Sequence, residues 1–318
     1  MILLALGVMS SVGLWIFLRV APRLGLIDYP NERSLHGSPT VVSGGVVPMT
    51  LLALSVASVS ELPSSKAVSV IMVGLAAIGL FDDRWGIPSG VRLICYLAAG
   101  IALPWMLFAD VFTHVALLLV LGVGVAWCIN LVNFMDGTDG FVTTQALCVA
   151  TGLGLIAVFG STKSADLSWL CALLFVCCAP MLWFNWPPAK LFMGDAGAIP
   201  LGFFLALLGL MSAATDPLVG VAWFILMMPF LVDTGMTLCI RALSGKPPHV
   251  AHRDHAYQRL TLLTGGPLNV TLGLLAMQVV WQFPLAVTAV NGGVFPALLV
   301  LLSAIPSTAA VVYARRRA

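Results

Sequence analysis

The sequence predicts an all-α polytopic integral membrane protein with about eleven transmembrane helices, and three observations support this. Of the 318 residues, 60% are hydrophobic and only 9% are charged, whereas soluble domains carry about 25% charged residues. Apolar segments close to membrane-spanning length recur along the chain with short links between them. The basic residues fall almost entirely on alternate links, as they do in cytoplasmic loops. These features leave no room for a separate soluble domain.

The apolar segments are predicted to be helices, because they lack the period of two that lipid-exposed barrel strands show. They lie at residues 1–20, 46–60, 67–81, 93–109, 114–131, 141–160, 168–185, 198–214, 217–240, 270–290 and 294–313. The second and third are short for a membrane span. The first lacks the basic n-region of a signal peptide, so we expect it to be retained as the first span.

The charge distribution predicts the orientation of these spans. If the N-terminus lies outside, 13 of the 15 basic residues fall on inside connections, and only Lys66 and Lys163 fall outside. The positive-inside rule predicts such a bias. The cluster Arg315–Arg317 then ends inside, which favours an odd number of spans and a cytoplasmic C-terminus.

The inside connections also hold nearly all of the clustered aspartate, histidine and asparagine. We expect one transmembrane domain, residues 1–318, with cytoplasmic loops at about 19–45, 82–92, 130–140, 185–197 and 241–269. An enzyme with its site on this face explains the pattern. A transporter of lipid-linked sugars is the alternative, but it would need polar groups at mid-membrane depth, where Asp233 is the clearest acid. A non-catalytic scaffold would need no clustered carboxylates.

Two of these loops begin with carboxylates that suit a hard cation. Asp82 and Asp83 follow an apolar segment directly, where the negative helix end disfavours adjacent acids unless a cation or proton is shared. A hydrated acid pair with Arg84 as counter-ion is the alternative, and the pair alone favours it. In the third loop, Asn133, Asp136 and Asp139 recur every three residues and share one helix face.

Oxygen ligands of this kind suit magnesium, which usually keeps waters and binds substrate phosphates. Helix termination by Asp-Gly turns is the alternative for the third loop. In the fourth loop, Asp195 is a metal ligand or a helix cap. The neighbouring Phe192 could stack on a base, and Lys190 could meet a phosphate.

The first and fifth loops supply cations. Arg33 and His36 are candidates in the first, where binding of anionic headgroups is the alternative. The fifth loop suits anion recognition, because arginine pairs bidentately with phosphate, with histidine catalysis as a lesser option. Its candidates are His249, His252, Arg253, His255 and Arg259. Carboxylates for magnesium, cations for phosphate and an adjoining bilayer together indicate chemistry on diphosphates and lipids.

Five segments, DYPNERSLHGSPTVVSGG, LFDDRWG, NLVNFMDGTDG, LFMGDAGA and HRDHAYQRL, occur in this order between about residues 19 and 260. In this combination the chain resembles the polyprenyl-phosphate N-acetylhexosamine-1-phosphate transferases, glycosyltransferase family 4. The last segment resembles the O-antigen-initiating branch. The resemblance implies catalytic roles for Asp82, Asp83, Asn133, Asp136 and Asp139. It also implies metal binding by Asp195 with Asp136, and uracil stacking on Phe192.

The resemblance further implies a bacterial inner-membrane enzyme that uses Mg²⁺, with Mn²⁺ as the alternative. The substrates would be a UDP-N-acetylhexosamine and undecaprenyl phosphate, and the products undecaprenyl-diphospho-sugar and UMP. Direct attack by the lipid phosphate is favoured, since phosphomonoesters are largely ionised at neutral pH. Membrane lipids are expected partners and nucleic acids are not. The sugar, the pathway and the oligomeric state, a homodimer included, stay open.

We expect the loop from His249 to Arg259 to select the donor sugar. The other inside loops are assigned to magnesium, diphosphate, uracil and lipid phosphate, which are common to every substrate. This loop is the richest in adaptable hydrogen-bond donors. A site that hydrogen-bonds a substrate group rejects analogues that lack it. The alternative is that this loop touches only anionic headgroups.

Overall fold

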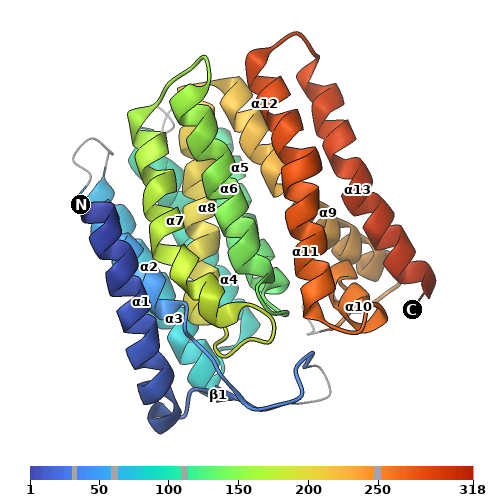
Figure 1. Ribbon diagram of the computed structural model, residues 1–318. Helices are drawn as coiled ribbons and strands as arrows, with labels where there is room; N and C mark the ends of the chain where they lie inside the picture. Colours follow the sequence, from blue (N-terminus) through green and yellow to red (C-terminus); the bar gives the residue numbers. More distant parts are fainter. Residues whose placement is uncertain (31–33, 59–63, 109–113, 247–251, 318) are drawn as a thin grey trace.

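The computed structural model describes residues 1–30, 34–58, 64–108, 114–246 and 252–317. The long helices run roughly alongside one another in a single bundle (Figure 1). They are α1 (Ile2–Val20), α3 (Ser65–Trp85), α4 (Ser89–Leu107), α5 (Val115–Met135), α6 (Phe141–Phe159), α7 (Ala165–Asn185), α8 (Asp195–Thr215), α9 (Pro217–Leu243) and α13 (Pro296–Arg317). The shorter α2 (Val46–Val56) packs on α3 and α7.

The remaining elements are shorter. Helix α11 (Pro267–Met277), a π-helical turn η3 (Gln278–Gln282) and α12 (Phe283–Asn291) form one continuous span. Helix α10 (Ala256–Leu263) and the 3-10 turn η1 (Ala21–Leu24) lie outside the bundle proper. Strands β1 (Ile27–Asp28) and β2 (Thr40–Val41) pair antiparallel in the first loop. The chain is therefore an all-α polytopic membrane protein, as predicted.

Within the described residues, ten helices are long and apolar enough to cross a membrane. The second expected span is the exception, because α2 has only 11 residues and a length of about 16 Å, about half of a hydrocarbon core of about 30 Å. Helix α2 starts close to α8, since the backbone of Gly45 approaches Gly197 so closely that a Cβ on either would clash. The first loop therefore reaches into the bundle before α2 begins.

Helix α8 lies at the centre of the bundle and positions the start of the fourth loop. Its span is 83% buried, against 11% for the peripheral α1, and it packs on α3, α5 and α9. Glycines allow this close packing: a Cβ on Gly202 would meet the Ile129 backbone of α5, and one on Gly79 would meet the Asp195 backbone. The N-terminus of α8 is thus fixed against the ends of the neighbouring helices.

The inside loops expected from the sequence meet at one end of the bundle, the lower end in Figure 1, where α10 and the C-terminus also lie. One boundary differs from the expectation. Asp82 and Asp83 belong to the last turn of α3 rather than to a loop, and α3 ends at Trp85. Their side chains are therefore held on a helix, in fixed positions relative to α8.

Candidate active site

A pocket of about 280 Å³ lies at this end of the bundle, among the inside loops. Five aspartates line it, together with an aromatic ring, two amides and a histidine. Its polar and aromatic lining includes Asp28, His36, Asp83, Asp136, Thr138, Asp139, Asn185, Phe192, Asp195 and Gln258. Residues from five separate loops or helix ends thus converge on one polar cavity.

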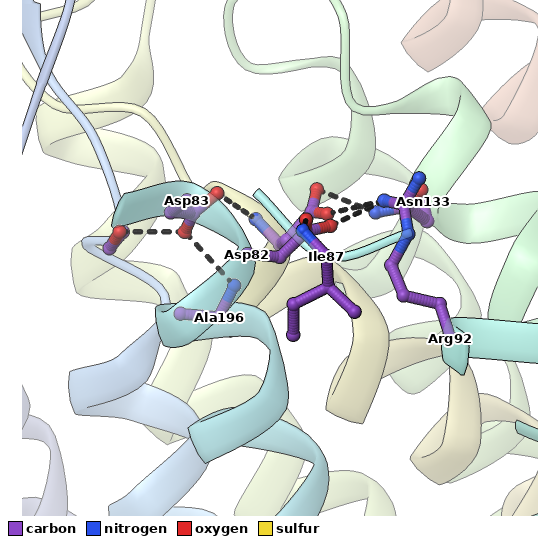
Figure 2. A network of polar contacts seen from close by, with 8 residues as sticks. Asp82, Asp83, Ile87, Arg92, Asn133 and Ala196 are labelled. Atoms are coloured by element: carbon purple, nitrogen blue, oxygen red, sulfur yellow. Dashed lines mark hydrogen bonds and ion pairs between the residues drawn. The ribbon is translucent and has the colours of Figure 1, made fainter. Parts of the chain in front are cut away.

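Asp83 holds the N-terminus of α8. Its carboxylate accepts hydrogen bonds from the backbone N–H groups of Asp195 at 2.9 Å and Ala196 at 3.2 Å (Figure 2). The hydroxyl of Ser43 donates a third bond at 2.6 Å. First-turn N–H groups have no partner within their own helix, so a carboxylate here is stabilising. Asp83, and not Asp195, is therefore the cap of α8.

Asp195 is held by a second set of contacts. Asn133 donates from Nδ2 to one carboxylate oxygen at 2.7 Å, and Arg92 donates from Nη1 to the other at 3.0 Å. The same Arg92 nitrogen also pairs with Asp82, whose other oxygen accepts the Ile87 N–H at 2.5 Å. Figure 2 shows Arg92 and Asn133 reaching these carboxylates from the same side. Arg92 thus bridges Asp82 and Asp195 and neutralises part of their charge.

Asp136 and Asp139 enter the pocket from the turn between α5 and α6. Burial raises the pKa of Asp136 well above its usual value, and the nearby Asp83 carboxylate adds to the rise. Burial also raises the pKa of Asp139, although the Ala189 N–H, which donates to its carboxylate at 2.9 Å, opposes the rise. An added cation would favour the charged form of both groups.

Asn185, at the end of α7, joins three segments of the wall. Its Oδ1 accepts from the N–H of Gly140 at 3.0 Å and the hydroxyl of Thr143 at 3.2 Å. Its Nδ2 donates to the carbonyl of Leu191 at 3.1 Å. These three bonds are directed at the scaffold, so Asn185 fixes the turn before α6 against the fourth loop.

The first loop covers one side of the pocket. His36 bonds through Nε2 to Asp28 at 3.1 Å, and its ring meets the edge of Phe192 with centroids 4.9 Å apart. The Phe192 backbone is held by β2, since its N–H donates to the carbonyl of Val41 at 2.8 Å. A flat aromatic ring beside carboxylates is thus presented on a fixed backbone.

The fifth loop supports the pocket from behind. Asp233 accepts the N–H groups of Ala256 at 2.8 Å and Tyr257 at 2.9 Å, and so caps α10. The Tyr257 hydroxyl then donates to the carbonyl of Phe134 at 2.9 Å, beside the Asp136 turn. Arg253 donates to the carbonyl of Ser34 at 2.7 Å, which ties this loop to the first.

The comparisons with known proteins agree with this geometry. Residues 65–213 match the family described as glycosyl transferase family 4. The chain is 28% identical over 305 residues to the decaprenyl-phosphate N-acetylglucosaminephosphotransferase of Mycolicibacterium smegmatis, covering 77% of this chain and 73% of that protein. It is 26% identical to a probable undecaprenyl-phosphate N-acetylglucosaminyl 1-phosphate transferase of Bacillus subtilis, covering 76% of this chain and 71% of that protein.

Over residues 65–213 the chain is therefore similar to glycosyl transferase family 4. The matched region runs from α3 to α8 and so contains Asp82, Asp83 and Asp195 together with the α5–α6 turn. A putative glycosyltransferase of Methanocaldococcus jannaschii also matches, at 24% identity over 70% of this chain and 71% of that protein.

The structure gathers most of the residues singled out in the sequence. Asp82 lies just behind the pocket, in contact with Arg92, and Asn133 touches Asp195. The residues that line the pocket itself are His36, Asp83, Asp136, Asp139, Phe192 and Asp195. Their catalytic and metal-binding roles stay predictions. Arg33 and His249 lie outside the described residues.

Five other predicted residues do not line this pocket, namely Lys190, His252, Arg253, His255 and Arg259. Lys190 is exposed and borders a separate apolar cavity. His255 is only 3% exposed and lies 3.4 Å from Asp233. The nucleotide- and sugar-binding roles of both residues stay predictions. Arg259 pairs with Asp254 at 2.9 Å.

His252 stacks on His255, and burial together with neighbouring His255 and Arg241 lowers its pKa to about 4. The side chains of His252, Arg253, His255 and Arg259 are thus engaged with the protein itself in this state.

Arg92, Ser43, Asn185, Thr138 and Gln258 belong to the site but were not singled out in the sequence. Arg92 carried a signal, since it is a lone arginine at the start of an apolar segment. A charge there needs a partner because its desolvation is costly. Nothing in the sequence alone distinguishes Asn185 from any other amide at a helix end.

Proposed function

We propose that the chain transfers an N-acetylhexosamine 1-phosphate from a UDP-sugar to undecaprenyl phosphate, with release of UMP. The observation that carries the proposal is the convergence of five aspartates and Phe192 on one pocket at the basic end of a membrane bundle. The printed names of the family 4 relatives describe polyprenyl-phosphate acceptors and N-acetylglucosamine phosphate transfer. They support the same reaction class for this chain.

In the proposed reaction an oxygen of the lipid phosphate attacks the β-phosphorus of the UDP-sugar. The bond from that phosphorus to the bridging oxygen breaks, and UMP leaves with the oxygen and its electron pair. Such a displacement depends on positioning and charge stabilisation more than on covalent chemistry of the protein. Asp83 would contribute by fixing α8, Arg92 by holding Asp195, and Phe192 by stacking on uracil.

Magnesium is part of the proposal, with manganese as the alternative. The side chains of the pocket fit magnesium as partial ligands, with the substrate supplying the others. Among the described residues, no three histidine, cysteine or acidic side chains converge closely enough to hold a metal alone. Magnesium commonly binds one or two carboxylates plus waters and substrate phosphates. Asp195 and Asp136 would hold it together with the diphosphate. Bound there, it would neutralise the charge that develops on the departing UMP.

We place the pocket on the cytoplasmic side of a bacterial inner membrane. Within the described residues, Arg19, Arg84, Arg241 and Arg315–Arg317 are at helix ends of the pocket side. Lys66 is at the opposite end of α3, and Lys163 is in the link between α6 and α7, also at the opposite end. This distribution supports the assignment through the positive-inside rule. Nucleotide sugars are made in the cytoplasm, so the donor would reach the pocket directly.

The step would initiate a lipid-linked glycan, and the segment His252–Arg259 favours the O-antigen branch. The test is an assay of purified protein with undecaprenyl phosphate, Mg²⁺ and a panel of UDP-N-acetylhexosamines, including UDP-GlcNAc and 6-deoxy sugars. We expect one donor to yield UMP and the corresponding lipid diphosphate. No turnover with the whole panel would contradict the proposal and would revive a transport function.

A further inference from the structure

A second candidate site lies on the membrane-facing side of the bundle. Helix α6 lies between α7 and α11 in Figure 1, and it packs on both of them. An apolar groove of about 340 Å³ follows this arrangement, with Thr151 and Gly152 of α6 in its lining and Phe175 and Val279 among its walls. Nothing in the proposed transfer reaction uses this groove.

The groove continues toward the pocket end of the bundle into a second apolar cavity of about 540 Å³. The two share Leu182 and Trp186 in their linings. The second cavity ends at Lys190, whose side chain is exposed and makes no ion pair with any residue that the structure describes. Trp183 beside it is 79% exposed. An apolar track that ends in exposed tryptophan and a lysine is typical of the boundary between acyl chains and headgroups.

The length of the groove fits one leaflet. Its lining on α6 runs from Thr144 to Leu155, which is about 16 Å at 1.5 Å per residue. Half of a hydrocarbon core of about 30 Å is about the same distance. An acyl chain of a phospholipid therefore fills the groove when its phosphate is at Lys190, whereas a polyprenyl chain is much longer than the groove.

A closed wall separates this track from the polar pocket. Asn185 bonds to Gly140 at 3.0 Å and to Leu191 at 3.1 Å, and Pro187 lies against Gly140. The Ala189 N–H donates to Asp139 on the pocket side. A phosphate at Lys190 is thus on the other side of the wall from the carboxylates. We propose that the groove and Lys190 bind an anionic phospholipid of the bilayer that is not the reacting lipid.

The bound lipid affects the reaction through the Ala189–Lys190 backbone, which forms part of the wall. Lys190 is the next residue after Ala189, which orients the Asp139 carboxylate, so a phosphate that holds Lys190 also holds that backbone. Anionic lipid should therefore raise kcat as well as bind. Attraction of a basic residue to an anionic surface is worth about 1 kcal/mol, which corresponds to about fivefold in apparent affinity for the lipid.

The test is native mass spectrometry of the purified chain from nanodiscs of phosphatidylcholine with phosphatidylglycerol, which needs no turnover. The expected result is retained phosphatidylglycerol that Lys190→Gln reduces about fivefold. Thr151→Phe, which fills the groove, should reduce it too, whereas Lys163→Gln at the opposite end of α7 should not. Equal retention by the wild type and Lys190→Gln would overturn the proposal.

Two further outcomes identify a different occupant and would also overturn it. If Lys190→Gln raises KM for polyprenyl phosphate in discs without phosphatidylglycerol, the groove holds the acceptor. If Thr151→Phe changes the oligomeric mass, a second copy of the chain covers it. An inactive preparation would contradict the proposed transfer reaction but would leave the lipid measurement intact.

Discussion

Asp83 and Asp233 make the same local contact in two parts of the molecule. Each carboxylate caps a helix by accepting two consecutive backbone N–H groups, Asp83 at the start of α8 and Asp233 at the start of α10. Their surroundings differ. Asp83 lines the polar pocket with Asp136 and Asp195, whereas Asp233 is 5% exposed and lies beside His255 and apolar side chains.

The comparison shows that a cluster of polar residues does not by itself mark the reaction site. Both regions combine aspartates with arginines, and the fifth loop adds histidines. Only around Asp83 do the carboxylates line a polar cavity. Around Asp233 the charges are matched within the protein: Arg241 and Arg259 both bind Asp254. Although partial burial opposes it, these bonds lower the pKa of Asp254.

The largest effect is expected at Asp195. Asp195→Asn should lower kcat by at least about 100-fold, because an amide is a weak magnesium ligand. Even mutation of a residue that only supports a metal ligand lowers metal affinity or activity about 10- to 100-fold. The measurement is the initial rate of UMP release over a range of Mg²⁺ concentrations. Asp216→Asn, which alters the N-cap of α9, is the matched control and should stay close to the wild-type rate. Half the wild-type rate for Asp195→Asn under limiting Mg²⁺ would contradict the assignment.

The two capping aspartates give the next prediction. Asp83→Ala and Asp233→Ala each remove one cap, which costs about 1 kcal/mol of stability. We expect the two variants to lose comparable amounts of Tm. The kcat per folded molecule should fall more than about tenfold for the Asp83 variant, as for other groups that support a metal site. It should change little for the Asp233 variant. Equal effects on kcat would remove the functional distinction between the two regions.

Arg92 is expected to act as a positioning residue, with a smaller effect. Arg92→Lys keeps the charge but moves it to a more flexible stem, which holds less firmly the nitrogen that contacts both Asp82 and Asp195. We expect about a tenfold loss of kcat and a higher requirement for Mg²⁺, in the range of supporting contacts at metal sites. Arg84→Lys, at the end of α3, is the control. If the two variants show the same Mg²⁺ dependence, the bridge has no role in orienting Asp195.

The smallest effect concerns pH and the fifth loop. The pKa of His252 is lowered to about 4 by burial and by His255 and Arg241, so the unfolded chain binds a proton more readily. The stability that neutral His252 contributes to the folded state is fully present above the unfolded pKa of about 6.5. It is lost as the pH falls toward 4. His252→Gln should therefore flatten the fall in Tm between these values, without changing the pH dependence of kcat above pH 6. A changed rate profile there would indicate that His252 titrates in the reaction.

Sequence alone predicted the bundle because membrane spans and charge bias are one-dimensional signals. Clustered acidic residues also singled out Asp195 and the Asp136–Asp139 turn. The expected shared helix face was wrong, because α5 ends at Met135 and both aspartates lie beyond it. It could not predict that Asp83 caps α8 or that Arg92 bridges two acids, because these contacts join residues 103 to 113 positions apart. Composition also does not show that Asp254 binds Arg241 and Arg259, or that His255 lies beside Asp233, so the role of the fifth loop stays a prediction.

The most direct test of the account is a single-turnover reaction with enzyme in excess over UDP-GlcNAc, undecaprenyl phosphate present and Mg²⁺ either supplied or chelated. If another UDP-N-acetylhexosamine proves to be the donor in the panel, it replaces UDP-GlcNAc. The account predicts that UMP and lipid-diphosphate sugar appear together in equal amounts, only with Mg²⁺, and that Asp195→Asn abolishes both. UMP released without the lipid phosphate, or lipid product formed unchanged by Asp195→Asn, would contradict it.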